Sequence, residues 1–345
     1  MPSTLSVLLV FFATIGSILA QSSPVDFFER GNKRATTGDT KGAVEDWNRA
    51  IELDSKFADA YYNLGLVHYN SSDFSGAIEY WNKAIAANPK HTDAYYNRAR
   101  AYIDIKQYEK ALIDLNKVIE LDPAPASTYI NRGIAYHGLG DDKKAIADYD
   151  LALRLDPSKI GAFHNRGISR LSIHDYAGSV ADLTRFIEKI PTEPKSYVSR
   201  GKAFAFLGNR DRALTDLNKA LELDSKLSEA YLVRGTVYFM NDNAAALNDI
   251  SKAIELDPKS IRAYFSRAFI KQFIKDYDGA VEDLTKAIEL DPENVLLYHL
   301  RATTYRLLGK SDLATADDKI AARLEKNKPT PSPIDLPLTI LPKTN

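Results

Sequence analysis

The residues that most often carry out chemistry form no recognisable site in this chain. Its six histidines include no HExxH motif and no pair four residues apart, the spacing that places two zinc ligands on one face of a helix. The chain has no cysteine, which excludes disulfides, thiolate nucleophiles and thiolate metal ligands. The motifs GxSxG, GxxxxGK(S/T) and GxGxxG are also missing. The sequence therefore predicts no catalytic residue, no metal, no cofactor and no small-molecule substrate, and hence no enzyme.

Charge is almost balanced along the chain. It contains 45 Lys and Arg residues against 46 Asp and Glu residues, for a net charge of -1, and it has no run of basic residues. Binding to a nucleic acid or an anionic membrane needs a concentrated positive surface. The composition therefore argues against both partners and favours a protein or peptide.

Amide side chains recur at one fixed spacing. Four asparagines stand 34 residues apart, at Asn63, Asn97, Asn131 and Asn165. An amide offers both a hydrogen-bond donor and an acceptor, which is the pair that a peptide bond requires. Asparagine is a mediocre helix former, so helix propensity does not explain its recurrence.

Opposite charges recur with the same period. Arginine occupies the next position in most units: Arg30, Arg98, Arg132, Arg166, Arg200, Arg234, Arg267 and Arg301. The second predicted helix of the same unit carries an aspartate for each of these arginines: Asp46, Asp114, Asp148, Asp182, Asp216, Asp249, Asp283 and Asp317. We predict an ion pair between packed helices, because the planar guanidinium suits a partly buried carboxylate. Where Leu64 replaces the arginine, Tyr80 replaces the aspartate, which supports a contact.

A 34-residue period runs through the chain and positions these side chains. Its clearest column holds small residues: Gly31, Gly65, Ala99, Gly133, Gly167, Gly201, Gly235, Ala268 and Ala302. An aromatic residue lies four positions before each of them, and many units close on Leu-Asp-Pro, where proline ends one helix and suits the first turn of the next. The pattern predicts a helix, turn, helix, turn unit repeated nine times. Trp47 and Trp81 occupy the core position of the second helix and are predicted to be buried.

This arrangement of aromatic residue, small residue, alanine and proline resembles the tetratricopeptide repeat. The resemblance covers 24–57, 58–91, 92–125, 126–159, 160–193, 194–227, 228–260, 261–294 and 295–328. It implies an all-α fold, a right-handed α-α superhelix or solenoid of tandem helix-turn-helix repeats, and we expect one elongated domain.

The resemblance also implies a site for the asparagines. In this family their position lines the concave surface, where stacked amides hold the main chain of an extended peptide. Tyr62, Tyr96 and His164 would flank them and add contact area. The alternative interpretation is that the asparagines are structural.

The expected concave face changes character toward the C-terminus. Its residues there are apolar: Phe206, Leu232, Phe239, Met240, Phe265, Phe269 and Phe273. An exposed apolar patch of this size predicts a partner site or self-association into a homo-oligomer. The alternative is that a tightly wound superhelix buries these side chains against itself.

The two ends of the chain differ from the repeats. Residues 1–20 contain an apolar run from Leu5 to Ala20, which predicts a cleaved export signal and a periplasmic or secreted protein; an uncleaved membrane anchor is the alternative. The last segment, 329–345, is rich in proline, so an extended tail is expected, and its apolar residues could dock onto the patch.

These features together predict a non-catalytic scaffold or adaptor that binds a peptide segment of a partner in its concave groove. Two alternatives remain at this level: a self-associating structural or assembly protein, and an accessory subunit of an envelope complex. The fold is strongly specified, but the partner is not, because this architecture serves many unrelated ligands.

Overall fold

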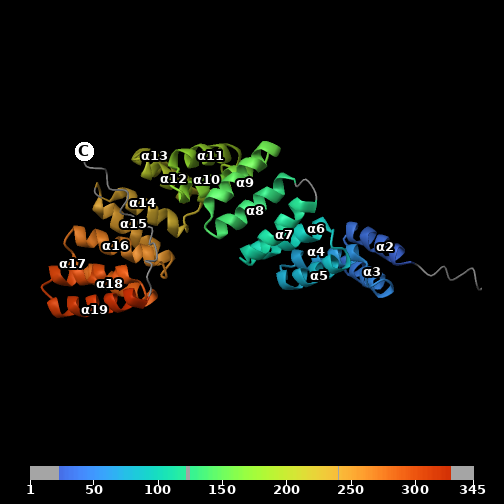
Figure 1. Cartoon of the computed structure of the whole chain (residues 1–345). Coiled ribbons are helices and arrows are strands. Elements are labelled where there is room, and N and C mark those ends of the chain that lie inside the picture. The colour runs from blue at the N-terminus through green and yellow to red at the C-terminus, as the bar shows by residue number, and fades with distance from the viewer. Residues whose placement is uncertain (1–22, 122–124, 240, 328–345) are drawn as a thin grey trace, which may run out of the picture. The chain divides into compact units, whose positions relative to one another are not determined.

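The computed structural model describes residues 23–121, 125–239 and 241–327, which form eighteen α-helices and no strand (Figure 1). The first eight helices are α2 (Pro24–Thr36), α3 (Thr40–Leu53), α4 (Ala58–Asn70), α5 (Phe74–Ala87), α6 (Thr92–Asp104), α7 (Tyr108–Leu121), α8 (Ala126–Gly138) and α9 (Asp142–Leu155). The other ten are α10 (Ile160–Ser172), α11 (Tyr176–Lys189), α12 (Pro194–Phe206), α13 (Arg210–Leu223), α14 (Ser228–Tyr238), α15 (Asn243–Leu256), α16 (Ile261–Phe273), α17 (Tyr277–Leu290), α18 (Val295–Leu307) and α19 (Ser311–Asn327).

Consecutive helices pack in pairs, and this confirms the predicted all-α fold of tandem helix-turn-helix repeats. The first helix of every pair begins at the first residue of a repeat identified from the sequence. We expected one elongated domain, but the chain divides into two compact units between Pro157 and Ser158. Each repeat of such an array packs only on its neighbours, so a division between repeats leaves both parts with a core of their own. We call them the N-terminal unit (α2–α9) and the C-terminal unit (α10–α19).

The turn within each pair is fixed by its backbone and by a cap. Gly38, Gly140, Gly208 and Gly309 occupy one position of this turn, and all adopt a left-handed conformation with φ between 73° and 87°. In six of the nine pairs an aspartate before the second helix accepts a hydrogen bond from a backbone amide three residues on, as Asp39 does from Gly42 at 2.9 Å. Such caps stabilise a helix by about 1 kcal/mol each.

A small residue lets the two helices of a repeat approach closely. A Cβ atom added to Gly65 would lie 2.4 Å from Nε1 of Trp81, and one added to Gly133 would lie 2.6 Å from Cε1 of Tyr149. Atoms do not approach to such distances, so only glycine permits these rings to pack across the helix. Trp47 and Trp81 are both buried, as predicted.

The core composition differs between the units. In the N-terminal unit the large side chains between paired helices are Trp47, Trp81 and Tyr149, together with Leu115. In the C-terminal unit the same position is aliphatic in the first four repeats: Leu183, Leu217, Ile250 and Leu284. In the last repeat it is Asp318, so every repeat but the last buries one bulky residue at this position, with different shapes in the two units.

The predicted export signal (1–20) and the whole of the predicted tail (329–345) lie outside the described residues. Among the helices that the structure describes, none combines the length and the apolar character needed to cross a bilayer.

Candidate functional site

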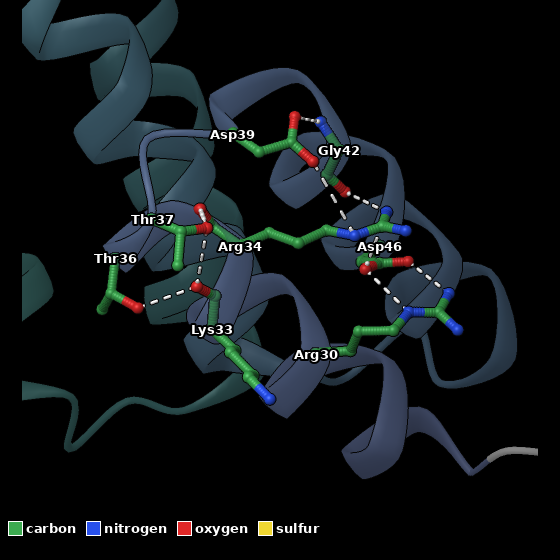
Figure 2. A network of polar contacts seen from close by, with 8 residues as sticks. All are labelled: Arg30, Lys33, Arg34, Thr36, Thr37, Asp39, Gly42 and Asp46. Atoms are coloured by element: carbon green, nitrogen blue, oxygen red, sulfur yellow. Dashed lines mark hydrogen bonds and ion pairs between the residues drawn. The ribbon is translucent and has the colours of Figure 1, made fainter.

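A framework of arginine–aspartate pairs joins the two helices of a repeat. Arg30 donates from Nε to Oδ2 of Asp46 at 2.9 Å and from Nη2 to Oδ1 at 2.5 Å, and Arg34 adds a second cation 3.1 Å from the same carboxylate (Figure 2). The same two-point contact occurs at all the other predicted pairs: Arg98–Asp114, Arg132–Asp148, Arg166–Asp182, Arg200–Asp216, Arg234–Asp249, Arg267–Asp283 and Arg301–Asp317. The predicted structural ion pair is confirmed.

The arginines also link neighbouring repeats. Nη1 of Arg98 donates to Oδ1 of Asn82 at 2.6 Å, and Asn82 belongs to the second helix of the preceding repeat. The guanidinium carbon of Arg98 lies 5.5 Å from the ring centre of Tyr95 and 5.9 Å from that of Tyr102. One side chain thus fixes the pairing of two helices and the stacking of two repeats.

The ionisation of Asp46 fits a structural role for its pair with Arg30. The hydrogen bonds from Arg30 hold the pKa of Asp46 below its usual value, so the carboxylate is ionised at neutral pH. In the second repeat the buried Leu64 takes the place of the arginine. An apolar contact can replace a buried ion pair without loss of stability when both partners change together. The pairs therefore position the first helices.

The N-terminal unit carries a hydrogen-bonded network across α4 and α6. Nδ2 of Asn97 donates to the hydroxyl oxygen of Tyr62 at 2.9 Å and to the carbonyl oxygen of Asp93 at 3.1 Å. Oδ1 of Asn97 accepts from Nη1 of Arg100 at 3.1 Å. Asn97 is buried and its amide is occupied on both sides, so this side chain fixes the surface around it.

Arg100 and Tyr69 extend the network toward the end of the helices. The guanidinium carbon of Arg100 lies 5.0 Å from the ring centre of Tyr69, whose hydroxyl donates to Oδ2 of Asp104 at 2.6 Å. Burial raises the pKa of both Tyr62 and Tyr69, so both phenols keep their protons at neutral pH. The ring of Tyr62 also packs on His91, with the centroids 4.9 Å apart. We call this set of side chains the polar network.

The asparagine column is not one uniform ladder. Nδ2 of Asn63 donates to Oδ1 of Asn32 at 2.8 Å, and the same oxygen accepts from Nε1 of Trp47 at 3.0 Å. Asn131 is half-buried in α8, and its side-chain amide makes no hydrogen bond with any residue of the described ranges 23–121, 125–239 and 241–327. The amide that is open to a ligand in the N-terminal unit is therefore that of Asn131.

The remaining predicted groove residues lie in different surroundings. Tyr96 is half-buried and packs against the core beside Leu115. His164 and Asn165 belong to α10 of the C-terminal unit, where Nδ1 of His164 lies 3.4 Å from Oδ1 of Asn165. The ring of His164 packs on Phe186 with the centroids 4.7 Å apart, and burial lowers the pKa of this histidine. The peptide-binding role of these residues stays a prediction.

The predicted apolar patch of the C-terminal unit is divided by burial. Leu232 is 4% exposed and Phe265 is 2% exposed, so these two side chains are core residues and not surface. Leu232 packs in the cluster of Ile250, and Phe265 packs with Leu284 and Leu297 of the next helices. The expectation of surface exposure was wrong here because neighbouring repeats stack against this side of the first helices.

The other members of the patch gather near the ends of the first helices. Phe239 contacts Phe269 and Phe273, with ring centroids 5.6 Å and 5.1 Å away. Phe273 is 51% exposed, while Phe206 is half-buried and stacks on Tyr176 at 4.7 Å. Met240 lies outside the described residues.

Three members of the network around Asn97 and Trp47 have no periodic signal in the sequence. Asn32 and Arg100 share one column, but Leu66 stands between them and Ile134 follows, so the column does not repeat. Asp104 is equally isolated. For Asn32 and Arg100 the only signal in the sequence was a polar residue at a position where the adjacent repeats carry Leu66 and Ile134.

No group of three or more histidine, cysteine, aspartate or glutamate residues is arranged to hold a metal ion within the part of the chain that the structure describes. The candidate sites are surfaces: the polar network with Asn131 in the N-terminal unit, and in the C-terminal unit the exposed Phe273 with the half-buried Phe206, Phe239 and Phe269.

Family models of the tetratricopeptide repeat match the chain at 58–91, 92–125, 126–159, 194–227, 261–294 and 284–316, and a further model described as a TPR repeat matches 31–72. Together these segments span more than half of the chain. A search among curated proteins finds no match.

Solved structures with related folds are numerous. The APC/C hetero-tetramer Cut9-Hcn1 matches with a TM-score of 0.57 at 16% identity, over 88% of this chain and 74% of that one. A tetratricopeptide repeat protein from Parabacteroides merdae matches with a TM-score of 0.53 at 20% identity, over 72% of this chain and 98% of that one. At these identities the similarity shows the fold alone.

Proposed function

Because the chain belongs to the tetratricopeptide repeat family, we propose that it is a non-catalytic scaffold that holds an extended segment of a partner protein against α4, α6 and α8. Repeat proteins of this family generally act as protein interaction scaffolds. The proposal adds the place and the chemistry of the contact, which belong to the N-terminal unit.

The observation that carries the proposal is the open amide of Asn131. The side-chain amide of Asn131 is half-buried and has no partner among the described residues, so a ligand can bond it without breaking a hydrogen bond inside the protein. The main chain of an extended peptide presents a donor and an acceptor that match both ends of this amide. Asn131 therefore offers a two-point contact that Asn97, already bonded at both ends, does not.

The polar network supports the proposal by holding the adjacent surface still. Tyr62 and Asn97 link α4 to α6, and α6 in turn contacts α8, which places the three first helices side by side. Arg100 is kept in place by Asn97 and by the ring of Tyr69. A surface that is rigid before binding loses less conformational entropy when a peptide docks.

The test starts from peptides selected against the purified chain from a displayed random library. Their Kd is then measured by fluorescence polarisation for the wild type and for Asn131→Ala, with Asn48→Ala, an exposed asparagine of the second helix α3, as the matched control. We expect a loss of about tenfold for Asn131→Ala, equal to about 1.4 kcal/mol, and no change for the control. Equal affinities of all three proteins, or no selected peptide, would contradict the proposal.

We also propose that this scaffold acts outside the cytoplasm, because the apolar run at 5–20 is short for a membrane span and its last residue, Ala20, precedes the polar Gln21, as at a signal-peptidase site. N-terminal sequencing of the protein isolated from its host decides the question. A mature chain that starts near Gln21 supports export, and a chain that keeps Met1 in the cytoplasm contradicts it.

A further inference from the structure

The C-terminal unit presents apolar side chains in a row at the ends of its first helices. The most exposed are Leu207 (47%), Phe273 (51%), Ile274 (42%) and Leu307 (54%), which follow or end α12, α16 and α18. Phe239 at the end of α14 joins this row through its contact with Phe273. We call this row the apolar edge. Phe239 and Phe273 are in contact, and exposed apolar side chains grouped in this way mark a site for an occupant.

We propose that the apolar edge is the docking site of the chain's own C-terminal segment, Ile334–Leu341. In that segment apolar residues alternate with others: Ile334, Leu336, Leu338 and Ile340 are separated by Asp335, Pro337 and Thr339. An extended chain places alternate side chains on the same side, so these four form one apolar face. The prolines exclude a helix and favour the extended form.

The place where the folded chain ends fits this occupant. Nε2 of His299 lies 3.1 Å from Oε1 of Glu325, so the last turn of α19 lies beside the first half of α18. The apolar edge lies at the opposite end of α18, whose thirteen residues span about 20 Å. The six residues 328–333, with the sequence KPTPSP, cover about 19 Å in a polyproline conformation. Ile334 would therefore arrive at the level of Leu307 and Phe273.

The remaining length matches the extent of the row. From Ile334 to Leu341 an extended chain covers about 23 Å, and packed helices lie about 8–10 Å apart. The apolar face of the segment can thus pass from Leu307 across Phe273 to Phe239, over three adjacent repeats. Docked in this way, the segment covers the apolar edge and competes with any other molecule for it.

The absence of native cysteine allows a direct test by disulfide formation in the full chain. One variant carries Leu307→Cys with Ile334→Cys, and the matched control carries Leu290→Cys with Ile334→Cys. Leu290 is also an exposed leucine, 38% exposed, but it ends the second helix α17, at the opposite end of the pair. Leu307 and Leu290 are exposed and Ile334 belongs to none of the described helices, so we expect these substitutions to leave the fold intact.

After mild oxidation we expect an intramolecular disulfide in the Leu307 pair, detected by intact mass and by mobility without reductant, in at least tenfold greater yield than in the control. Equal yields from the two pairs would overturn the proposal. A disulfide that forms only between chains would assign the edge to a second copy, and would overturn it as well.

Binding of an apolar dye gives an independent readout. Replacing Leu336, Leu338 and Ile340 by Asp should raise dye fluorescence severalfold, because the edge loses its cover. Replacing Thr330, Ser332 and Thr339 by Asp adds the same charge to the same segment and should leave the fluorescence unchanged. The proposal fails if both triple variants give the signal of the wild type.

Discussion

The N-terminal and C-terminal units use one framework to present different surfaces. Both hold their first helices with the same arginine–aspartate contact, illustrated by Arg98–Asp114 in one and Arg200–Asp216 in the other. The N-terminal unit buries indole and phenol rings and carries the polar network on α4 and α6. The C-terminal unit buries aliphatic side chains at the position that the N-terminal unit fills with these rings, and it exposes Phe273 at the end of α16.

This difference shows which positions carry structure and which are free to specify a partner. The framework satisfies the charged groups and fixes the stacking, so the exposed face of the first helices is not needed for stability. A repeat fold can therefore change its surface without changing its architecture. Four comparisons of variants test where the boundary between these two kinds of position lies.

The largest effect should come from the core of the C-terminal unit. Phe265→Ala removes a ring that is 2% exposed and should lower the free energy of unfolding by about 4 kcal/mol, because it leaves a cavity. Phe273→Ala removes the same ring from a site that is 51% exposed and should cost less than about 1 kcal/mol. Urea unfolding followed by circular dichroism compares the two. Similar costs would show that both phenylalanines belong to the same environment.

The next effect concerns the shared framework. Asp148→Ala leaves Arg132 half-buried and unpaired and should cost about 3 kcal/mol. The double change Arg132→Leu with Asp148→Tyr copies the arrangement of Leu64 and Tyr80 in the second repeat and should cost less than the single change. The same unfolding experiment measures both. A double variant that is less stable than Asp148→Ala would mean that the pair is not replaceable as a unit.

A smaller effect separates the two kinds of core. Gly65→Ala places a Cβ 2.4 Å from the Trp81 ring and should cost about 2 kcal/mol, since the indole has no room to move. Gly201→Ala meets Leu217 at 3.1 Å, and alanine's gain in helix propensity of about 1 kcal/mol offsets this mild contact. We expect thermal unfolding to show a lower midpoint for Gly65→Ala alone. Equal shifts of the unfolding midpoint in both variants would argue that the size of the Trp81 ring is not the reason for glycine at position 65.

The smallest effect is a dependence on pH in the C-terminal unit. Burial lowers the pKa of His164, so the unfolded chain binds a proton more readily than the folded chain. The contribution of His164 to stability is therefore complete above the unfolded pKa of about 6.5 and decreases as the pH falls below it toward the folded pKa. His164→Asn should remove this part of the slope, measured as urea midpoints between pH 7.5 and 5, whereas His174→Asn at an exposed turn serves as the control. A slope that His164→Asn leaves unchanged would assign it to other groups.

The sequence by itself determined the fold and its internal framework. The 34-residue period specifies the helix pairs, because each helix must bury one stripe of side chains against its neighbours. The arginine and aspartate columns predicted the arginine–aspartate pairs that join the two helices of a repeat, and their joint absence at Leu64 and Tyr80. These features recur from repeat to repeat, so the pattern in one repeat supports the interpretation of the next.

Only the tertiary structure decided which side chains are open to a partner. The four asparagines look equivalent in the sequence, but Asn97 is bonded at both ends while Asn131 is not, because single residues such as Arg100 and Tyr62 reach across from neighbouring positions. Leu232 and Phe265 look like surface residues, but the stacking of the next repeat buries them. The division between Pro157 and Ser158 also has no signal in the period. A periodic pattern records what every repeat shares, whereas exposure depends on the particular side chains that meet when the repeats pack.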